Sequence, residues 1–175
     1  YLVLFLCETD CDKEDSFKPN LSENTFHATS VRFDDGRKFT FDKAFLDSYD
    51  KIIVCQANGI EADTMLDTFF EHFASCLSDK TAVDFFFLGH GSKSGIRLSL
   101  QGNIKTRYFG PSDFNEQSKF ACSFKKIVQT KIDEGINPRV FLIGCKTDIL
   151  ELPMQSFLDE QYRNHLKIFG TPNDT

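Results

Sequence analysis

Two stretches of the sequence end an apolar run with a residue that can take part in catalysis. The stretch DFFFLGHGSKSG (residues 84–95) places His90 between two glycines, and RVFLIGCKTD (residues 139–148) places Cys145 directly after Gly144. A thiol and an imidazole in one cleft form a nucleophile and an acid/base pair, and cysteine needs no further relay because its thiolate is strongly nucleophilic. The two stretches together predict covalent catalysis by Cys145, with His90 as the proton carrier.

The runs before these two residues are typical of strands that are buried on both faces. Apolar runs of this kind, rich in Phe, Ile and Val, indicate a mostly parallel sheet. Five of them occur along the chain: Leu2–Cys7, Lys51–Gln56, Val83–Leu88, Arg139–Gly144 and Lys167–Gly170.

Helices and hairpins are predicted between these strands. Apolar spacing, together with proline and glycine at the ends, predicts helices over Glu61–Leu77, Ser112–Gly135 and Pro153–Leu166. Alternating apolar and polar residues around Asp35-Gly36, and again over Gly95–Phe109, predict two β-hairpins. The sequence therefore predicts an α/β fold, with a mostly parallel sheet flanked by helices and decorated by β-hairpins.

The predicted fold brings the two candidate residues together. Active sites of open parallel sheets lie beyond the carboxyl ends of the strands, where His90 and Cys145 both fall. One long helix separates their strands, and a right-handed crossover of that kind commonly makes two strands neighbours, about 4.8 Å apart. Asp84 is excluded as a partner that orients His90, because six strand residues separate them by about 20 Å.

Residues next to the pair have expected roles of their own. The backbone N–H groups of Gly91 and Cys145 are candidates for an oxyanion hole. Ile143 lies two residues before the nucleophile, on the same side of its strand, and is expected to line the substrate pocket. An apolar substrate residue before the cut bond follows from this, unless Asp148 enters the pocket and favours Lys or Arg.

Composition limits the classes of partner and the cellular compartment that we expect. The net charge is −6 and no basic block exceeds two residues, which argues against nucleic acid as a partner. The apolar start YLVLFLC is too short to span a membrane. The six cysteines fall mostly in strand-like or helix-like runs, which predicts reduced thiols in a cytoplasmic compartment, with no metal and no cofactor. We expect one domain over residues 1–175, cut from a longer protein because it begins without Met.

The two stretches resemble the histidine and nucleophile segments of the caspase-like (clan CD) cysteine peptidases. That group includes caspases, gingipains, clostripain, separase, CHAT domains and the self-cleaving domains of bacterial toxins. The tail MQSFLDEQYRNHLKIFGTPND (residues 154–174) is similar to the helix and strand that follow the cysteine in CHAT and toxin-type members. The resemblance implies a three-layer sandwich and a cysteine endopeptidase that cuts a protein substrate or its own parent chain, including delivery into a cell as an effector or toxin domain.

The chain also departs from parts of this group. Caspases carry Gln two residues before the nucleophile and Arg after it, where this sequence has Ile143 and Lys146. The toxin domains are activated by a highly phosphorylated inositol in a basic pocket, whereas the basic residues here are scattered, so the sequence does not indicate a small-molecule activator and leaves open whether one is needed. Two alternatives stay open: a non-catalytic interaction domain of the same fold, and a thiol acyl hydrolase or transferase that acts on a non-protein substrate.

Overall fold

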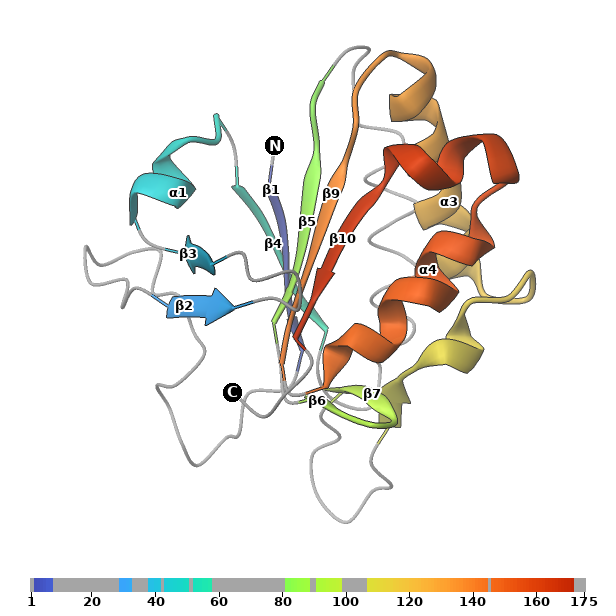
Figure 1. The fold of residues 1–175 in the computed structure, drawn as a ribbon, viewed down its shortest axis with the longest axis horizontal. Helices are drawn as coiled ribbons and strands as arrows, with labels where there is room; N and C mark the ends of the chain where they lie inside the picture. The colour runs from blue at the N-terminus through green and yellow to red at the C-terminus, as the bar shows by residue number, and fades with distance from the viewer. Residues whose placement is uncertain are drawn as a thin grey trace.

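A parallel sheet forms the centre of the molecule. The computed structural model of the chain describes residues 2–7, 29–32, 38–41, 43–50, 52–57, 81–88, 91–98, 107–144 and 146–171. Within them, five strands pair in the order β10-β9-β5-β1-β4, and every neighbouring pair is parallel (Figure 1). Their bounds are β1 Leu2–Cys7, β4 Ile52–Ala57, β5 Asp84–Leu88, β9 Arg139–Ile143 and β10 Lys167–Gly170. The predicted α/β class and the five predicted strands are confirmed, with ends that differ by at most one residue.

One face of the sheet packs against the longest described helix, α3 (Lys119–Asp133). Phe85 and Phe87 of β5 and Val140 and Leu142 of β9 share this face and belong to one buried core. The ring of Phe85 meets the ring of Phe124 of α3 edge-on at 5.2 Å. Apolar residues at helical spacing on α3 complete the contact: Phe120, Ala121, Phe124, Ile127 and Val128.

The opposite face carries a second aromatic layer. The ring of Phe141 in β9 stacks on Phe169 of β10 at 5.2 Å and lies 6.1 Å from Phe86 of β5. Phe45, from helix α1 (Lys43–Asp47), meets Phe141 edge-on at 6.0 Å. Helices therefore contact both faces of the sheet, as Figure 1 shows for α1 on one side and α3 on the other.

The helix predicted over Ser112–Gly135 begins later than expected. A 3₁₀ turn, η1 (Pro111–Asp113), precedes it. The side-chain oxygen of Asn115 then accepts the backbone N–H groups of Gln117 and Ser118. Ser118 then caps α3, since its hydroxyl accepts the N–H of Ala121 at 3.1 Å. The end agrees with the prediction: Gly135 has a φ of +84° and the hydrogen bonds of a Schellman motif follow Asp133.

The helix predicted over Pro153–Leu166 is instead divided in two. It forms α4 (Glu151–Phe157) and the 3₁₀ segment η3 (Glu160–His165), with Leu158 in extended conformation between them. Leu158 is buried, and the next residue, Asp159, is held by α3: its N–H donates to Gln129 and its carboxylate pairs with Lys125. Burial of Leu158 and this contact with α3 account for the break.

Both predicted hairpins have their strands in place. Strand β2 (Thr29–Arg32) pairs antiparallel with β3 (Lys38–Phe41), and β7 (Gly95–Leu98) pairs antiparallel with β8 (Arg107–Phe109). A short strand that the sequence did not predict, β6 (Gly91–Ser92), joins β7 to make a sheet of three strands. The helix predicted over Glu61–Leu77 lies outside the described residues.

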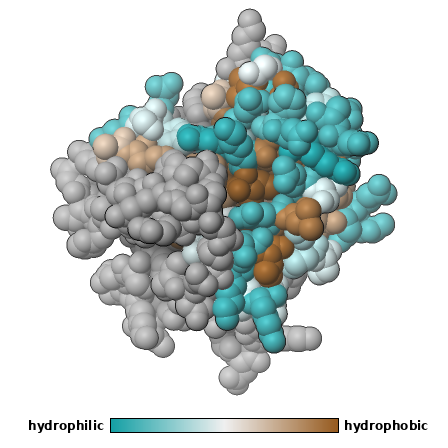
Figure 2. Space-filling model, in the orientation of Figure 1, coloured by the Kyte–Doolittle hydropathy of each residue, from teal (hydrophilic) through white to brown (hydrophobic). Residues whose placement is uncertain are grey.

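The surface on the α3 and α4 side is mostly hydrophilic, with hydrophobic atoms exposed only in smaller groups (Figure 2). Among the residues that the structure describes, Leu152 is the one large hydrophobic side chain that is exposed, at 73%. The helices within the described ranges are all too short or too polar to cross a membrane.

Candidate active site

The two strands that lead to the candidate catalytic residues are direct neighbours. Strand β5 pairs with β9 from Asp84 opposite Arg139 to Leu88 opposite Ile143. His90 follows Leu88 by two residues, and Cys145 follows Ile143 by two residues. The two segments therefore leave the sheet at the same edge and at the same level, after Leu88 and Ile143. The predicted neighbourhood of the strands is confirmed, while His90 and Cys145 themselves lie outside the described residues.

The chain after His90 is fixed by the small antiparallel sheet. Gly91 lies in β6 opposite Ile96 of β7, which is fully buried. Ile96 in turn lies opposite Phe109 of β8, whose ring stacks on Phe87 of β5 at 6.1 Å. The segment after His90 therefore turns back onto the core of the main sheet.

Hydrogen bonds to β9 and to the residue after β10 hold the chain after Cys145. Lys146 has a left-handed backbone, with a φ of 55°, which is uncommon for a residue other than glycine. Thr147, the first residue of the 3₁₀ segment η2 (Thr147–Leu150), is fully buried, and its hydroxyl donates to the carbonyl of Leu142 at 2.7 Å. The hydroxyl also accepts the N–H of Thr171, just after β10, at 3.0 Å. In the sequence, Cys145 thus falls between strand β9 and the left-handed turn and short helix that begin at Lys146.

The two segments that follow the candidate residues are in contact with each other. Strand β7 packs against η2, so the chain after His90 and the chain after Cys145 lie side by side beyond the carboxyl edge of the sheet.

The other predicted site residues are distributed around this edge. Ile143 ends β9 and is 2% exposed, so a substrate side chain would reach it only where its covering opens. Asp148 is partly exposed and lies beside β10: its N–H donates to the carbonyl of Thr171 at 3.4 Å. Since β10 and β5 flank β9 on opposite sides, Asp148 lies on the side of β9 away from the strand of His90. Their roles in a substrate pocket stay predictions.

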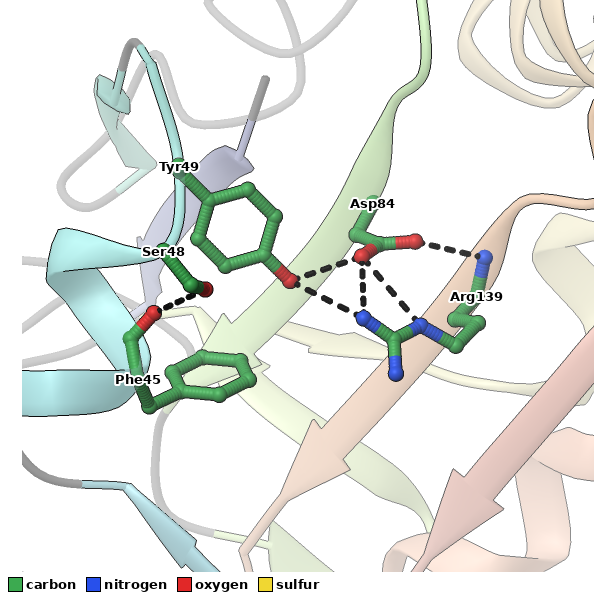
Figure 3. A network of polar contacts seen from close by, with 5 residues as sticks. All are labelled: Phe45, Ser48, Tyr49, Asp84 and Arg139. Carbon is green, nitrogen blue, oxygen red and sulfur yellow. Dashed lines mark hydrogen bonds and ion pairs between the residues drawn. The ribbon is translucent and has the colours of Figure 1, made fainter.

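A polar cluster occupies the opposite edge of the same two strands (Figure 3). Asp84 and Arg139, the first residues of β5 and β9, form an ion pair at 2.7 Å, and the backbone N–H of Arg139 donates to the same carboxylate. The hydroxyl of Tyr49, two residues after α1, donates to Asp84 at 2.7 Å. Asp84 is therefore fully engaged by structural partners, which agrees with its exclusion as a partner of His90.

This cluster fixes the register of the strands. Asp84 and Arg139 are opposite each other in the pairing, and a slip of one residue would separate them and turn every side chain of β9 to the other face. Level amino ends produce level carboxyl ends, since both strands contain five residues. The cluster therefore supports, from the far end of the sheet, the level endings of β5 at Leu88 and of β9 at Ile143.

The cluster gives a pH-dependent prediction for Tyr49. Burial, and then the hydrogen bond to Asp84 and its negative charge, raise the pKa of the Tyr49 phenol well above its ordinary value near 10. The unfolded chain loses this proton above pH 10 while the folded chain keeps it. The contribution of Tyr49 to the free energy of unfolding is therefore complete below pH 10 and is lost as the pH rises further. We expect Tyr49→Phe to flatten the decline of the urea midpoint above pH 10.

Tyr162 provides the matched control. Its hydroxyl also bonds a carboxylate, that of Asp133, but the pair lies at the surface. Tyr162→Phe should leave most of the alkaline decline in place. An equal decline in wild type and Tyr49→Phe between pH 10 and pH 11.5 would contradict the role assigned to the phenol.

The sequence did not identify Thr147 or Thr171 as parts of the site. Nothing in GCKTD distinguishes a buried threonine from an exposed one, because the burial of Thr147 depends on β10, which begins about twenty residues later. Over the ranges that the structure describes, no group of three or more His, Cys, Asp or Glu side chains is arranged to hold a metal ion. Cys122, exposed on α3, is a free thiol.

Comparisons of the chain with protein-family models, with curated proteins and with solved structures find no match.

Proposed function

We propose that the chain is a cysteine endopeptidase with a three-layer, caspase-like sandwich fold, and that His90 and Cys145 form its catalytic dyad. The observation that carries the proposal is the level ending of β5 and β9, with Leu88 opposite Ile143, followed by contact between β7 and η2. The residue types after the two strands, an imidazole and a thiol, are those that acyl transfer requires.

The proposed reaction has two steps. The thiolate of Cys145 attacks the carbonyl carbon of the scissile peptide, and the N–H groups of Gly91 and Cys145 stabilise the oxyanion. Protonated His90 gives its proton to the leaving amine as the C–N bond breaks. Water then attacks the thioester with His90 as base, which releases the acid product and the free thiol. The substrate is a protein or peptide, including the parent chain.

The backbone beside Cys145 supports this assignment independently of residue type. Lys146 adopts a left-handed conformation that costs free energy for a non-glycine residue, and such residues cluster at active sites where the surroundings hold them. Here the groups that hold it are the buried Thr147 and the end of β10.

A peptidyl acyloxymethyl ketone tests the proposal, because it alkylates a thiolate that an adjacent imidazole has activated. We expect the reagent to label Cys145 in the folded protein much faster than Cys122, an exposed free thiol that serves as internal reference. Labelling of the two cysteines at equal rates, or of Cys122 alone, would contradict the dyad. Labelling without cleavage of any peptide in a library would instead favour the acyl hydrolase or transferase alternative.

Substrate preference provides a further prediction. An apolar side chain gains about 1.5–3 kcal/mol on full burial, whereas an unpaired charge loses several kcal/mol against a side chain such as Ile143. We therefore expect a leucine-like residue before the cut bond, preferred over aspartate by at least about tenfold. Profiling of a peptide library measures this preference.

The same library tests the competing role of Asp148. A strict requirement for Arg or Lys would assign specificity to Asp148, and Asp148→Asn should then abolish that requirement. A strict requirement for Asp would contradict the role of Ile143 altogether.

A further inference from the structure

Beyond the carboxyl end of β9, two buried threonines connect three parts of the chain. The Thr147 hydroxyl donates to the carbonyl of Leu142 at 2.7 Å and lies 3.2 Å from the carbonyl of Gly144. It accepts the N–H of Thr171 at 3.0 Å, and the Thr171 hydroxyl donates to the same Leu142 carbonyl at 3.3 Å. Thr147 is 0% exposed and Thr171 is 2% exposed, so water does not compete for these hydrogen bonds. We call this group the threonine cluster.

The two hydroxyls differ in what they connect. The Thr147 hydroxyl joins residue 147 to Leu142 and Gly144 and so closes a ring of backbone around position 145. The Thr171 hydroxyl reaches the same acceptor from the end of β10, and Thr171 is joined to the segment after residue 145 through its backbone, whose carbonyl accepts the N–H of Asp148 at 3.4 Å. Thr147 therefore makes the direct link between β9 and the segment after residue 145, and Thr171 makes an indirect one.

The turn at Lys146 needs such a restriction. Lys146 has its φ at 55°, and a left-handed residue with a Cβ persists only where surrounding contacts hold it. Further contacts support the ring from outside: the N–H of Gly170 donates to Glu151 at 2.6 Å, and Gly170 has no space for a Cβ, which would lie 2.6 Å from the Cα of Asp148.

We propose that Thr147 is a positioning residue, whose hydroxyl holds the backbone at Cys145 in the conformation that presents the thiol to His90. The inference rests on the dyad proposed above and adds a residue that touches neither the substrate nor the reacting atoms. Displacement of a reacting group by about 1 Å lowers rates by about a hundredfold, so loss of the hydroxyl acts on the chemical step. Substrate binding is left nearly unchanged.

The test compares Thr147→Val with Thr147→Ser and with Thr171→Val in the whole chain. Valine keeps the shape of threonine without the hydroxyl, serine keeps the hydroxyl, and Thr171→Val removes a buried hydroxyl that donates to the same carbonyl. The readout is the rate of alkylation of Cys145 by iodoacetamide from pH 5 to pH 10, measured on the Cys145 peptide by mass spectrometry. Cys122, an exposed thiol, serves in the same sample as the internal reference for reactivity.

Wild type should show a Cys145 alkylation midpoint below the ordinary thiol value of about 8.5. Thr147→Val should raise that midpoint by about one pH unit or more and lower kcat by about tenfold to a hundredfold, with KM within about threefold. Thr147→Ser and Thr171→Val should both retain the wild-type profile. Where Thr147→Val does not fold, Thr147→Ala replaces it, because a water in the vacated space bonds the backbone groups without tying them to residue 147.

Failure of the inference and failure of the proposed function give different results. If the alkylation midpoint of Cys145 is low in wild type and stays low in Thr147→Val and Thr147→Ala, the role of Thr147 is overturned and the dyad is not. An equal shift in Thr171→Val also overturns it, since the effect would then come from buried hydroxyls in general. A wild-type Cys145 that reacts no differently from Cys122 at any pH overturns the dyad, and the role of Thr147 with it.

Discussion

Replacing Cys145 with alanine is expected to abolish substrate cleavage, and replacing His90 with alanine to lower kcat by about a thousandfold or more. The first change removes the nucleophile, and the second removes the group that protonates the leaving amine. Removal of one member of a catalytic unit loses most of the effect of the whole unit. The double variant should therefore cleave no more slowly than Cys145→Ala alone. Initial rates on the best substrate of the peptide library measure these effects.

Other cysteines of the chain supply the controls. Cys122→Ala should retain full activity, because its thiol is exposed on α3 and hydrogen-bonds the backbone carbonyl of Glu116. Cys55→Ala and Cys76→Ala should also retain it, since Cys55 lies within β4, Cys76 lies within the helix predicted over Glu61–Leu77, and neither residue follows the end of a strand. Full activity in Cys145→Ala would exclude the peptidase mechanism, whereas loss of activity in Cys122→Ala would move attention to α3.

The core strands were predictable because their signal is local and dense. In β5 and β9 nearly every residue is apolar, and both faces are in fact covered: Phe85 meets Phe124 of α3, while Phe86 meets Phe141 on the other face. A short apolar run of that kind has few other stable environments. The helix starts were less predictable, because Ser112 and Ser118 are equally good caps by type, and the choice depended on the turns at Pro111 and Asn115.

The neighbourhood of β5 and β9 could be predicted from the connection between them, but the contacts that support it could not. Strand β6 is two residues long and depends on β7 and on Phe109 for its place. Thr147 depends on Thr171, which is distant in sequence. Local pattern therefore predicted the two strands and the candidate residues that follow them, and contacts between distant segments determine how the chain after those residues is held.

Gly95→Ala is expected to cost about 3 kcal/mol or more of unfolding free energy. Gly95 has a φ of +123°, where residues with a Cβ are strained, and it lies in β7 against the backbone of β8. A Cβ there would overlap the carbonyl of Phe109 and lie 2.8 Å from the Cα of Gly110. Because these atoms belong to the backbone, no side-chain rotation relieves the overlap, and β7 must move away from β8.

Gly135→Ala separates strain from overlap in this experiment. Gly135 also has a positive φ, of +84°, but no atom lies within 4 Å of the position that a Cβ would occupy. Its substitution should cost only about 1–2 kcal/mol, so urea unfolding of the two variants measures the contribution of the close approach. Gly95→Ala should also slow cleavage, because β7 holds β6, the strand that follows His90, and contacts η2, which follows Cys145. Equal stability of the two variants would contradict the packing of β7 on β8, and a stable Gly95→Ala variant with unchanged kcat would show that the small sheet does not position His90.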